Sequence, residues 1–470
     1  MSDESLPKLA KAPIPIQTHT LGVEERLAKG KALRNVVSRK AQSEFKPPAK
    51  RLDPVDLLIE SSQGRMEELL PIRYGRMMVS PFTFYRGAAA VMAYDLSNTP
   101  ATGLTLLADG DCHLLNFGGF ATAERKLIFD INDFDEVSLA PWEWDVKRLA
   151  ASFVIAGQSN GFDMDDCKEA AWLAAQGYRQ RMLEYSGMST LETWNDSFDL
   201  NTIIESMVDK DMKRFYTKKL TGATAQSAHE KEFAKLTFSA GDTPRIVDQP
   251  PLIFHMNDER DQEFFQVAIT TLKEYRKSLN LGISLLLDRF VIVDVAYKVV
   301  GVGSVGTVCG IILLMSGKGD PLFLQFKQAR QSVLEPYCGL SPWDHAGKRV
   351  VMGQKAVQAA GDMFLGWATG AGKAKGHFYF RQLSDAKIKP VIELMKPVNL
   401  KNYAGLCGRV LARAHARTCD PFVLTGYMGK STAFEDALAD FSVAYSEQNE
   451  RDHAALLKAI RDGRLEARTE

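Results

Sequence analysis

The sequence predicts an α+β protein of two lobes, one mostly helical and one rich in strands. Three observations lead to this prediction. The chain has 470 residues, enough for a large two-lobed protein. Long stretches between residues 61 and 290 carry apolar residues at helical spacing. Residues 289–330 instead alternate β-branched and apolar residues around glycines, which indicates antiparallel strands.

Composition and charge exclude several classes of protein. With 45% hydrophobic and 25% charged residues, the chain is an ordinary globular sequence rather than a disordered or fibrous one. Its 58 Lys+Arg residues balance 58 Asp+Glu residues, so there is no global positive field and we do not expect a nucleic-acid partner. Six widely spaced cysteines without a CxxC pair argue against a disulfide scaffold.

Neither a leader nor a membrane span is expected. The N-terminus lacks a basic region followed by an apolar stretch, so we expect a cytoplasmic protein without a membrane partner. Residues 299–316 carry no charge and approach the length of a span. They include four glycines, however, and we interpret them as a glycine loop running into an apolar strand.

Four regions follow one another along the chain. Residues 1–52 hold eleven Lys/Arg and five Asp/Glu, which predicts a partly ordered basic arm. Residues 53–290 predict a helical lobe, including a helix over 141–158 that begins with a proline and two acids. Residues 291–385 predict the strand lobe. Residues 386–470 return to helical spacing and are expected to rejoin the helical lobe.

A glycine motif lies between two predicted strands. Gly301, Gly303 and Gly306 form GxGxxG, with Ser304 inside it. Such glycines open a helix in dinucleotide-binding folds, whereas in kinases they turn a β-hairpin that covers the phosphates of ATP. The following residues, VCGIILLM, lack helical periodicity and favour the hairpin. Lys327 ends the next strand, where it is expected to pair with nucleotide phosphates.

Lys327 is expected to have an acidic partner that orients its ammonium group. Glu335, eight residues further on, is the candidate. Gln354 on the following helix is the alternative, because Pro336 disfavours a long helix around Glu335.

Polar residues also follow two predicted strands earlier in the chain. Asp111 and Asn116 follow an apolar strand within 102–120, and Asp133 ends a second strand within 125–136. Phosphoryl transfer needs a carboxylate near the attacking hydroxyl, and oxygen ligands for Mg²⁺. One such turn is common for structural reasons, but two of them together with a glycine hairpin and a lysine indicate a site.

These motifs resemble a known superfamily. GDCHLLN resembles the GDxHxxN loop of aminoglycoside and choline phosphotransferases, NDFDE is similar to their IDFDD segment, and WEWDVKRLA resembles their DLA helix. The resemblance implies Asp111 as catalytic base, Asn116 and Asp133 as metal ligands, His113 as a shaping residue and Asp145 as a structural acid. It also implies ATP and Mg²⁺ as cofactors.

A second resemblance covers most of the chain. From about Arg34 to Tyr445 the sequence resembles a bacterial family known as domain of unknown function 2252. The segments that carry it are RMMVSPFTFYRGAAAVMA, DGDCHLLNFGGF, FDINDFDE, WEWDVKRLAAS, KVVGVGSVGT, GQKAVQAAGDMFLGW, FYFRQLSDAK and LARAHAR. The family name implies no activity.

The order of the motifs differs from that of ordinary kinases. There the glycine loop and lysine precede the catalytic loop and metal-binding Asp; here the loop at 110–116 and Asp133 come before Lys327. The cyclic order is kept, so the resemblance implies a circularly permuted, two-lobed protein-kinase-like fold. Permutation is tolerated where the original termini lie close together. A structure with Lys327 far from Asp133 would contradict it.

The sequence therefore predicts an ATP- and Mg²⁺-dependent phosphotransferase acting on the hydroxyl of a small molecule. A protein-modifying transferase of phosphate or AMP and a non-catalytic nucleotide-binding or scaffold protein are the alternatives. Arg86 is open to two interpretations, a contact with phosphate or substrate and a buried structural ion pair.

Overall fold

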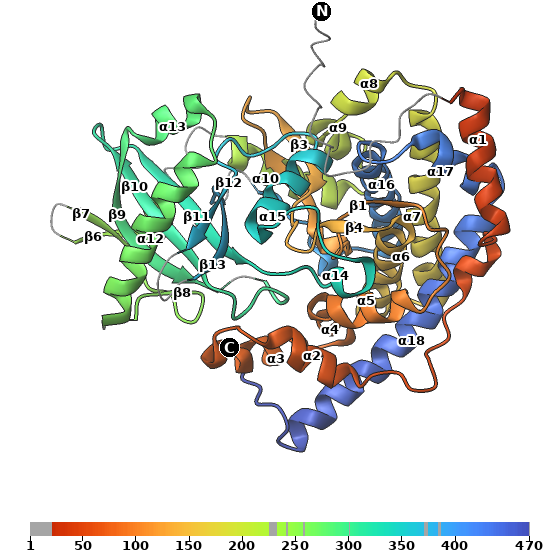
Figure 1. The fold of residues 1–470 in the computed structure, drawn as a ribbon, viewed down its shortest axis with the longest axis horizontal. Coiled ribbons are helices and arrows are strands. Elements are labelled where there is room, and N and C mark those ends of the chain that lie inside the picture. Colours follow the sequence, from red (N-terminus) through yellow and green to blue (C-terminus); the bar gives the residue numbers. More distant parts are fainter. Residues whose placement is uncertain are drawn as a thin grey trace, which may run out of the picture.

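The computed structural model has two lobes, one built on a sheet and one mostly helical (Figure 1). It describes residues 21–224, 233–240, 243–256, 259–299, 301–370, 375–383 and 387–469. The first 20 residues of the predicted basic arm lie outside the described residues. The rest of the arm includes helix α1 (Val23–Ala32), which packs on α17 (Pro421–Met428) of the helical lobe.

The strand lobe is a six-stranded sheet with the order β12-β13-β11-β10-β9-β8. All neighbouring strands are antiparallel. The strands are β8 (Ile253–Phe254), β9 (Phe290–Lys298), β10 (Cys309–Ser316), β11 (Pro321–Ala329), β12 (Gly366–Gly370) and β13 (Gly376–Gln382). The prediction of three antiparallel strands over 289–330 is confirmed. The uncharged segment 299–316 is a turn followed by β10, and no helix among the described residues is long and apolar enough to span a membrane.

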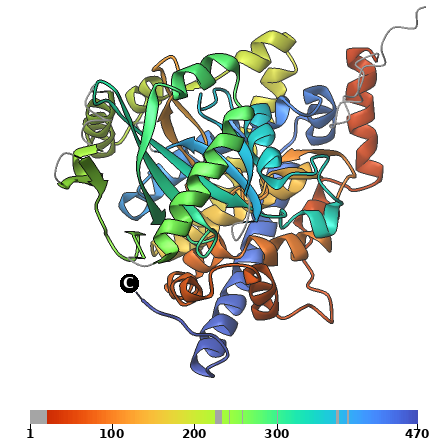
Figure 2. The ribbon, with the colours of Figure 1, turned by 60° about the vertical axis from the view of Figure 1, so that its left-hand side comes forward.

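One face of this sheet is covered by an aromatic cluster. Helix α12 (Glu259–Lys277) lies across it (Figures 1 and 2), with α13 (Leu281–Leu287) at its end. Phe326, Phe378 and Phe380 point to this face because alternate residues of a strand share a side. Tyr275 of α12 stacks on Phe380 with ring centroids 4.3 Å apart. The opposite face carries Lys327 and faces the rest of the molecule.

The helical lobe is built around closely packed long helices. These are α6 (Trp142–Ser159), α7 (Met164–Tyr185), α16 (Pro397–Ala416) and α18 (Ala433–Arg461). Glycines allow α7 and α16 to approach: a Cβ atom at Gly177 would lie 2.2 Å from the carbonyl oxygen of Gly405. The helix predicted over 141–158 is present, and α16 lies in the region 386–470 where helical spacing was predicted, with Pro397 in its first turn.

Short strands carry the predicted polar loops. β1 (Thr105–Ala108) pairs with β4 (Ser138–Pro141), and β2 (Phe117–Ala121) pairs with β3 (Leu127–Ile131), which also contacts β5 (Phe198–Asp199). β6 (Thr237–Ala240) and β7 (Thr243–Ile246) form a hairpin. The remaining helices are α2 (Pro54–Ser62), α3 (Leu70–Met77), α4 (Pro81–Gly87), α5 (Ala89–Ser97), α8 (Thr190–Asn195), α9 (Leu200–Glu205), α10 (Lys210–Thr224), α14 (Glu335–Cys338) and α15 (Ala346–Val357). The chain is therefore an α+β protein, as predicted.

Candidate active site

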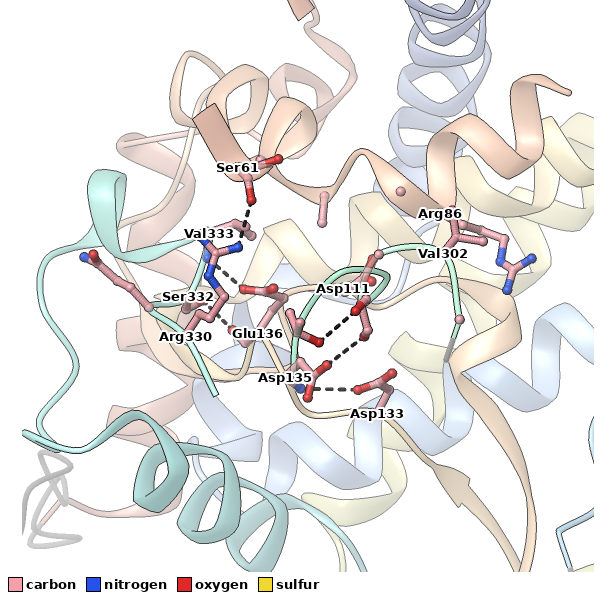
Figure 3. A pocket seen from close by; sticks show the side chains of 18 of the residues that line it. Ser61, Arg86, Asp111, Asp133, Asp135, Glu136, Val302, Arg330, Ser332 and Val333 are labelled. Carbon is pink, nitrogen blue, oxygen red and sulfur yellow. Dashed lines mark hydrogen bonds between the residues drawn. The ribbon is translucent and has the colours of Figure 1, made fainter. Parts of the chain in front are cut away.

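A cavity of about 310 Å³ lies where segments distant in the sequence meet (Figure 3). Much of its lining comes from four connections that each follow a strand. We call residues 301–306, which follow β9, the glycine turn, and residues 132–137, which follow β3, the acidic loop. The lining includes Asp111, His113 and Asn116 after β1, Asp133, Asp135 and Glu136 of the acidic loop, residues of the glycine turn, and Arg330 after β11. Lys327 and Asp135, 192 residues apart, are in direct contact. The motifs predicted from separate parts of the sequence thus share one site.

Asp111 is held by Arg148 of α6. Nε of Arg148 donates a hydrogen bond of 2.9 Å to Oδ1 of Asp111, and Nη2 donates to the same oxygen. The Asp111 side chain is 22% exposed. Burial raises the pKa of Asp111 to about 7, although the Arg148 charge acts in the opposite direction. Near neutral pH this carboxyl group can therefore both accept and release a proton.

Asn116 and His113 shape the loop around Asp111. Nδ2 of Asn116 donates to the carbonyl oxygen of Asp111 at 2.8 Å, which leaves the amide oxygen as an acceptor. Nδ1 of His113 accepts a hydrogen bond from the Leu115 N–H at 3.2 Å. Burial lowers the pKa of His113 well below its usual range, so the imidazole is neutral. His113 is therefore an internal brace of the loop.

Asp145 connects the same loop to the helical lobe. Its carboxylate accepts hydrogen bonds from the N–H groups of Asp109 and Gly110 at 2.6 and 2.9 Å. Nε2 of His415 on α16 lies 3.1 Å from the same carboxylate, and the hydroxyl of Tyr178 on α7 lies 2.8 Å from Nδ1 of His415. All these side chains are buried, so the loop before Asp111 is fixed by three helices.

Lys327 forms a buried ion pair with Asp135. Nζ contacts Oδ2 of Asp135, and the Tyr379 hydroxyl donates to Oδ1 at 2.7 Å. Burial alone would raise the pKa of Asp135, but the Lys327 charge and these hydrogen bonds outweigh it and lower the pKa to about 2. Burial likewise lowers the pKa of Lys327, but the charge of Asp135 outweighs it and raises that pKa. Both groups are therefore charged at neutral pH.

The glycine turn reaches this ion pair. Gly301 and Gly306 have φ angles of 65° and 86°, a conformation that residues with a Cβ atom rarely adopt. Between them, Oγ of Ser304 donates to Oδ2 of Asp135 at 3.1 Å and accepts from Nζ of Lys327 at 2.6 Å. The turn thus lies directly over the charged pair.

The segment joining α2 to α3 holds the turn in place. Arg65 donates to the carbonyl oxygen of Val305 at 2.7 Å, and the N–H of Met66 donates to the carbonyl oxygen of Gly306 at 2.7 Å. Arg76 of α3 donates to the carbonyl oxygen of Gly301 at 2.5 Å. Main-chain carbonyls of the turn are thereby fixed without using its side chains.

The predicted pairing of Lys327 with Glu335 is not the one in the structure. Oε1 of Glu335 lies 3.6 Å from Nε of Arg349, while Lys327 binds Asp135. The alternative partner, Gln354, donates to Oε1 of Gln358 at 2.8 Å. Glu335 does not reach Lys327 because the chain leaves the sheet after β11, before α14 begins at Glu335. Helix α15, with the sequence AGKRVVMGQKAV, has no acidic residue that could face the lysine instead.

Arg349 gives α15 a different role. Its guanidinium donates to the carbonyl oxygens of Asp135 at 2.7 Å, Val137 at 2.5 Å and Arg330 at 2.8 Å. The side chain is buried. Helix α15 therefore holds the backbone of the acidic loop against the end of β11. It does not bind Lys327.

Asp133 and Asn116 are the oxygen donors expected to hold Mg²⁺. Among the described residues, the Asp133 carboxylate accepts one long hydrogen bond, from the Asp135 N–H at 3.4 Å (dashed in Figure 3). No three His, Cys, Asp or Glu side chains in the described ranges are grouped to hold a metal ion. Mg²⁺ commonly binds one or two protein oxygens together with water and substrate phosphates. The donor set fits that mode rather than a closed metal site.

A second cation stands beside the acidic loop on the sheet face of Lys327. Nε of Arg381 on β13 donates to Oε1 of Gln325 at 3.0 Å, and Nη1 lies 3.5 Å from the carbonyl oxygen of Asn132. Burial lowers the pKa of Arg381, but Tyr379 and Asp133 outweigh it and raise it. The middle of this sheet face is therefore polar and charged.

The far end of the same face is apolar and covered by the chain itself. We call the described residues between 236 and 255 the cover segment. Phe323 shares the face of Lys327 because the two are four residues apart on β11. The cover segment packs there through Leu236, Ile246 and Ile253 against Ala296, Ile311, Leu313, Phe323 and Leu383. The Ile246 N–H also donates to Oδ2 of Asp294 at 2.8 Å.

Asp135 and Arg148 are among the residues of this site that the sequence analysis did not assign. Asp135 belongs to the NDFDE motif, and its spacing of two from Asp133 after a strand marks it as a second acid on the same side. Arg148 lies in WEWDVKRLA, three residues after Asp145, on a helix face that also faces the loop. Both signals were present, but neither pattern shows which distant group is contacted.

The fold and site together define a mixed α+β protein with an acid- and arginine-lined cavity between its lobes. Residues 65–459 match the model of a family described as "Uncharacterized protein conserved in bacteria (DUF2252)". The chain therefore belongs to this family, and the expected membership is confirmed. Neither a curated protein nor a solved structure matches the chain.

Proposed function

We propose that this protein is an ATP- and Mg²⁺-dependent phosphotransferase with a circularly permuted, protein-kinase-like fold, acting on a hydroxyl of a small molecule. The observation that carries the proposal is the meeting of the glycine turn, Asp133 and Asp111 around one cavity, with Lys327 bound to Asp135 and Ser304 of its lining. Asp111 and Asp133 precede the glycine turn and Lys327 in the sequence, which is the order expected of a circularly permuted kinase-like chain.

The topology of the strand lobe supports the proposal. The glycine turn joins neighbouring strands β9 and β10, and Lys327 lies on the next strand, β11. Kinases use this arrangement to cover the phosphates and to bring a lysine to them. The anchoring of the Asp111 loop by Asp145 also agrees with the role that the resemblance gives this acid.

Each group has a distinct role in the proposal. Asp111, with a pKa of about 7, orients the acceptor hydroxyl and takes its proton. Lys327 and the N–H groups of the turn stabilise phosphate charge. Asn116 and Asp133 would hold Mg²⁺, which supplies charge neutralisation between the phosphates when bound. Asp135 keeps Lys327 charged and in place before a nucleotide arrives.

Turnover of ATP in the presence of hydroxyl compounds tests the proposal. The protein is incubated with Mg-ATP and a panel of small alcohols, sugars and amino alcohols, and ADP, AMP and pyrophosphate are measured. We expect acceptor-dependent ADP formation that falls about 10²–10⁴-fold in Asp111→Asn. The matched control is Asp165→Asn, a change at an exposed residue outside the cavity lining.

Two results would count against phosphoryl transfer. Release of pyrophosphate instead of ADP would indicate transfer of a nucleotidyl group, and release of AMP would indicate transfer of a pyrophosphoryl group. Equal ADP formation in the wild type and in Asp111→Asn would remove Asp111 from the reaction.

A further inference from the structure

Arg86 differs from the other cations that line the cavity. Its guanidinium forms no hydrogen bond or ion pair with any described residue, and its Nε is buried without a partner. The other three guanidiniums of the lining have oxygen acceptors: Arg65 binds Val305 and Ser61, Arg73 binds Ser62 and Gly87, and Arg330 binds Ser61 and Gln63. Those three hold α2 and the glycine turn, and Arg86 does not.

Arg86 is close enough to Asp111, the proposed catalytic carboxylate, and to Glu393 for their charges to oppose the lowering of its pKa by burial. It lies in the last turn of α4, next to Tyr85, whose carbonyl oxygen accepts a 3.0 Å hydrogen bond from Arg148, the residue that holds Asp111. A Cβ atom at Gly303 would lie 3.5 Å from the carbonyl oxygen of Arg86, so the glycine turn passes over this residue. In Figure 3, Arg86 and Arg330 lie on opposite sides of the acidic residues.

Partial burial of a guanidinium without hydrogen-bond acceptors costs free energy of folding unless a ligand supplies those acceptors. Burial removes water from the cation, and buried charges in proteins are normally paired and hydrogen-bonded. The planar fork of arginine matches the oxygens of a phosphate or carboxylate group. A purely structural arginine at this place would be bonded to the protein, as Arg73 is.

We propose that Arg86 forms an oxyanion subsite of the cavity, which binds a phosphate or carboxylate group next to the hydroxyl that Asp111 orients. The assignment of this anionic group to the acceptor molecule rests on the proposed function. Anion binding itself does not need turnover. The position at Asp111, rather than at Lys327, favours the acceptor over the nucleotide as the source of the anion.

Binding of inorganic phosphate to the full-length protein tests the subsite. Isothermal titration compares the wild type with Arg86→Gln, and with Arg214→Gln as a matched control at an exposed arginine outside the lining. We expect phosphate affinity to fall at least about tenfold in Arg86→Gln and to stay unchanged in Arg214→Gln. Equal affinity in wild type and Arg86→Gln would overturn the proposal, as would a wild type that does not bind millimolar phosphate.

A conservative variant keeps the test decisive if Arg86→Gln unfolds. Arg86→Lys retains the charge but loses the planar fork, so we expect phosphate binding weakened several-fold with an unchanged unfolding temperature. Wild-type affinity in a folded Arg86→Lys, with Arg86→Gln unfolded, would overturn the subsite.

A second titration separates the two sources of the anion. If the acceptor supplies it, phosphate binds to the complex with a non-hydrolysable Mg-ATP analogue, and Arg86→Gln leaves analogue affinity unchanged. If the nucleotide supplies it, the analogue displaces phosphate and binds more weakly to Arg86→Gln. Both results support the subsite. Absence of analogue binding to the wild type would contradict the proposed function while leaving the phosphate result intact.

Discussion

The two ends of one sheet face differ in what covers them. Near Lys327 the face is polar: Lys327 binds Asp135 and Ser304, and Tyr379, its neighbour on β13, donates to Asp135. Toward Phe323 the face is apolar, and the cover segment seals it with three aliphatic side chains. The end that would meet phosphates is therefore preassembled by electrostatics, and the other end is closed by hydrophobic packing.

Because their contacts differ, mutations can perturb the two ends of the sheet face separately. Breaking an ion pair leaves a buried charge behind, whereas trimming an aliphatic side chain leaves a cavity. In the proposed function, the Lys327 end governs the chemistry. The covered end governs the packing of the cover segment on the sheet.

The largest expected effect follows from removing the lysine. Lys327 is 3% exposed, and Lys327→Met leaves the carboxylate of Asp135 without its cation. We expect unfolding free energy to fall by about 3–5 kcal/mol and ATP turnover to be lost. Denaturant unfolding measures the first effect. Lys327→Met combined with Asp135→Asn should regain part of the stability but none of the activity; an additive loss would contradict the coupling of the pair.

A smaller effect is expected at the covered end. Ile246 is 1% exposed, and Ile246→Ala should cost about 2–4 kcal/mol in local stability by removing part of the cover's apolar contact. Hydrogen exchange should then accelerate in the described residues of the cover segment but not at β11, and affinity for a Mg-ATP analogue should rise or stay constant. Faster exchange at β11, or weaker analogue binding, would show that the two ends are not separable.

The smallest expected effect depends on pH and on the ion pairs of His255. Close contact with Asp294 and then with Asp248 raises the pKa of His255 to about 9, against burial. Arg245 also faces Asp294, at 3.5 Å. Because the folded pKa is above the unfolded value of about 6.5, this stabilisation is complete below pH 6.5 and is lost as pH rises through 9.

Replacement of the imidazole should remove that dependence. In His255→Gln we expect a loss of about 1.5–3 kcal/mol at pH 6 that shrinks toward zero at pH 9–10, when unfolding is measured across this range. A loss that is the same at both ends of the pH range would mean that the protonated histidine does not hold the cover segment.

The sequence allowed much of the polar end to be predicted. Glycines at positions that need positive φ, a lysine at the end of a strand and acids after two strands are local signals, and Gly301, Gly306, Lys327, Asp111 and Asp133 were found from them. The partner of Lys327 was predicted wrongly as Glu335, because a pairing between residues 192 positions apart leaves no periodic trace.

The covered end could not be predicted for a related reason. Ile246 and Ile253 lie in an irregular stretch rich in proline and aspartate, which reads as a loop between helices. Only the tertiary structure shows that its few aliphatic residues face the strand lobe. Likewise, Arg86 was a candidate from the sequence, but that it has no hydrogen-bond partner among the described residues depends on packing, which the sequence does not show.

Thermal unfolding with and without Mg-ATP tests the central claim most directly, on the wild type, on Asp133→Asn and on the exposed control Asp165→Asn. A ligand that binds only the folded state at a hundredfold excess over its dissociation constant adds about 2.7 kcal/mol. The claim predicts this Mg²⁺-dependent shift in the wild type and in Asp165→Asn, and a much smaller one in Asp133→Asn. Equal shifts in all three proteins, or no shift in the wild type at millimolar Mg-ATP, would contradict a nucleotide site assembled around Asp133.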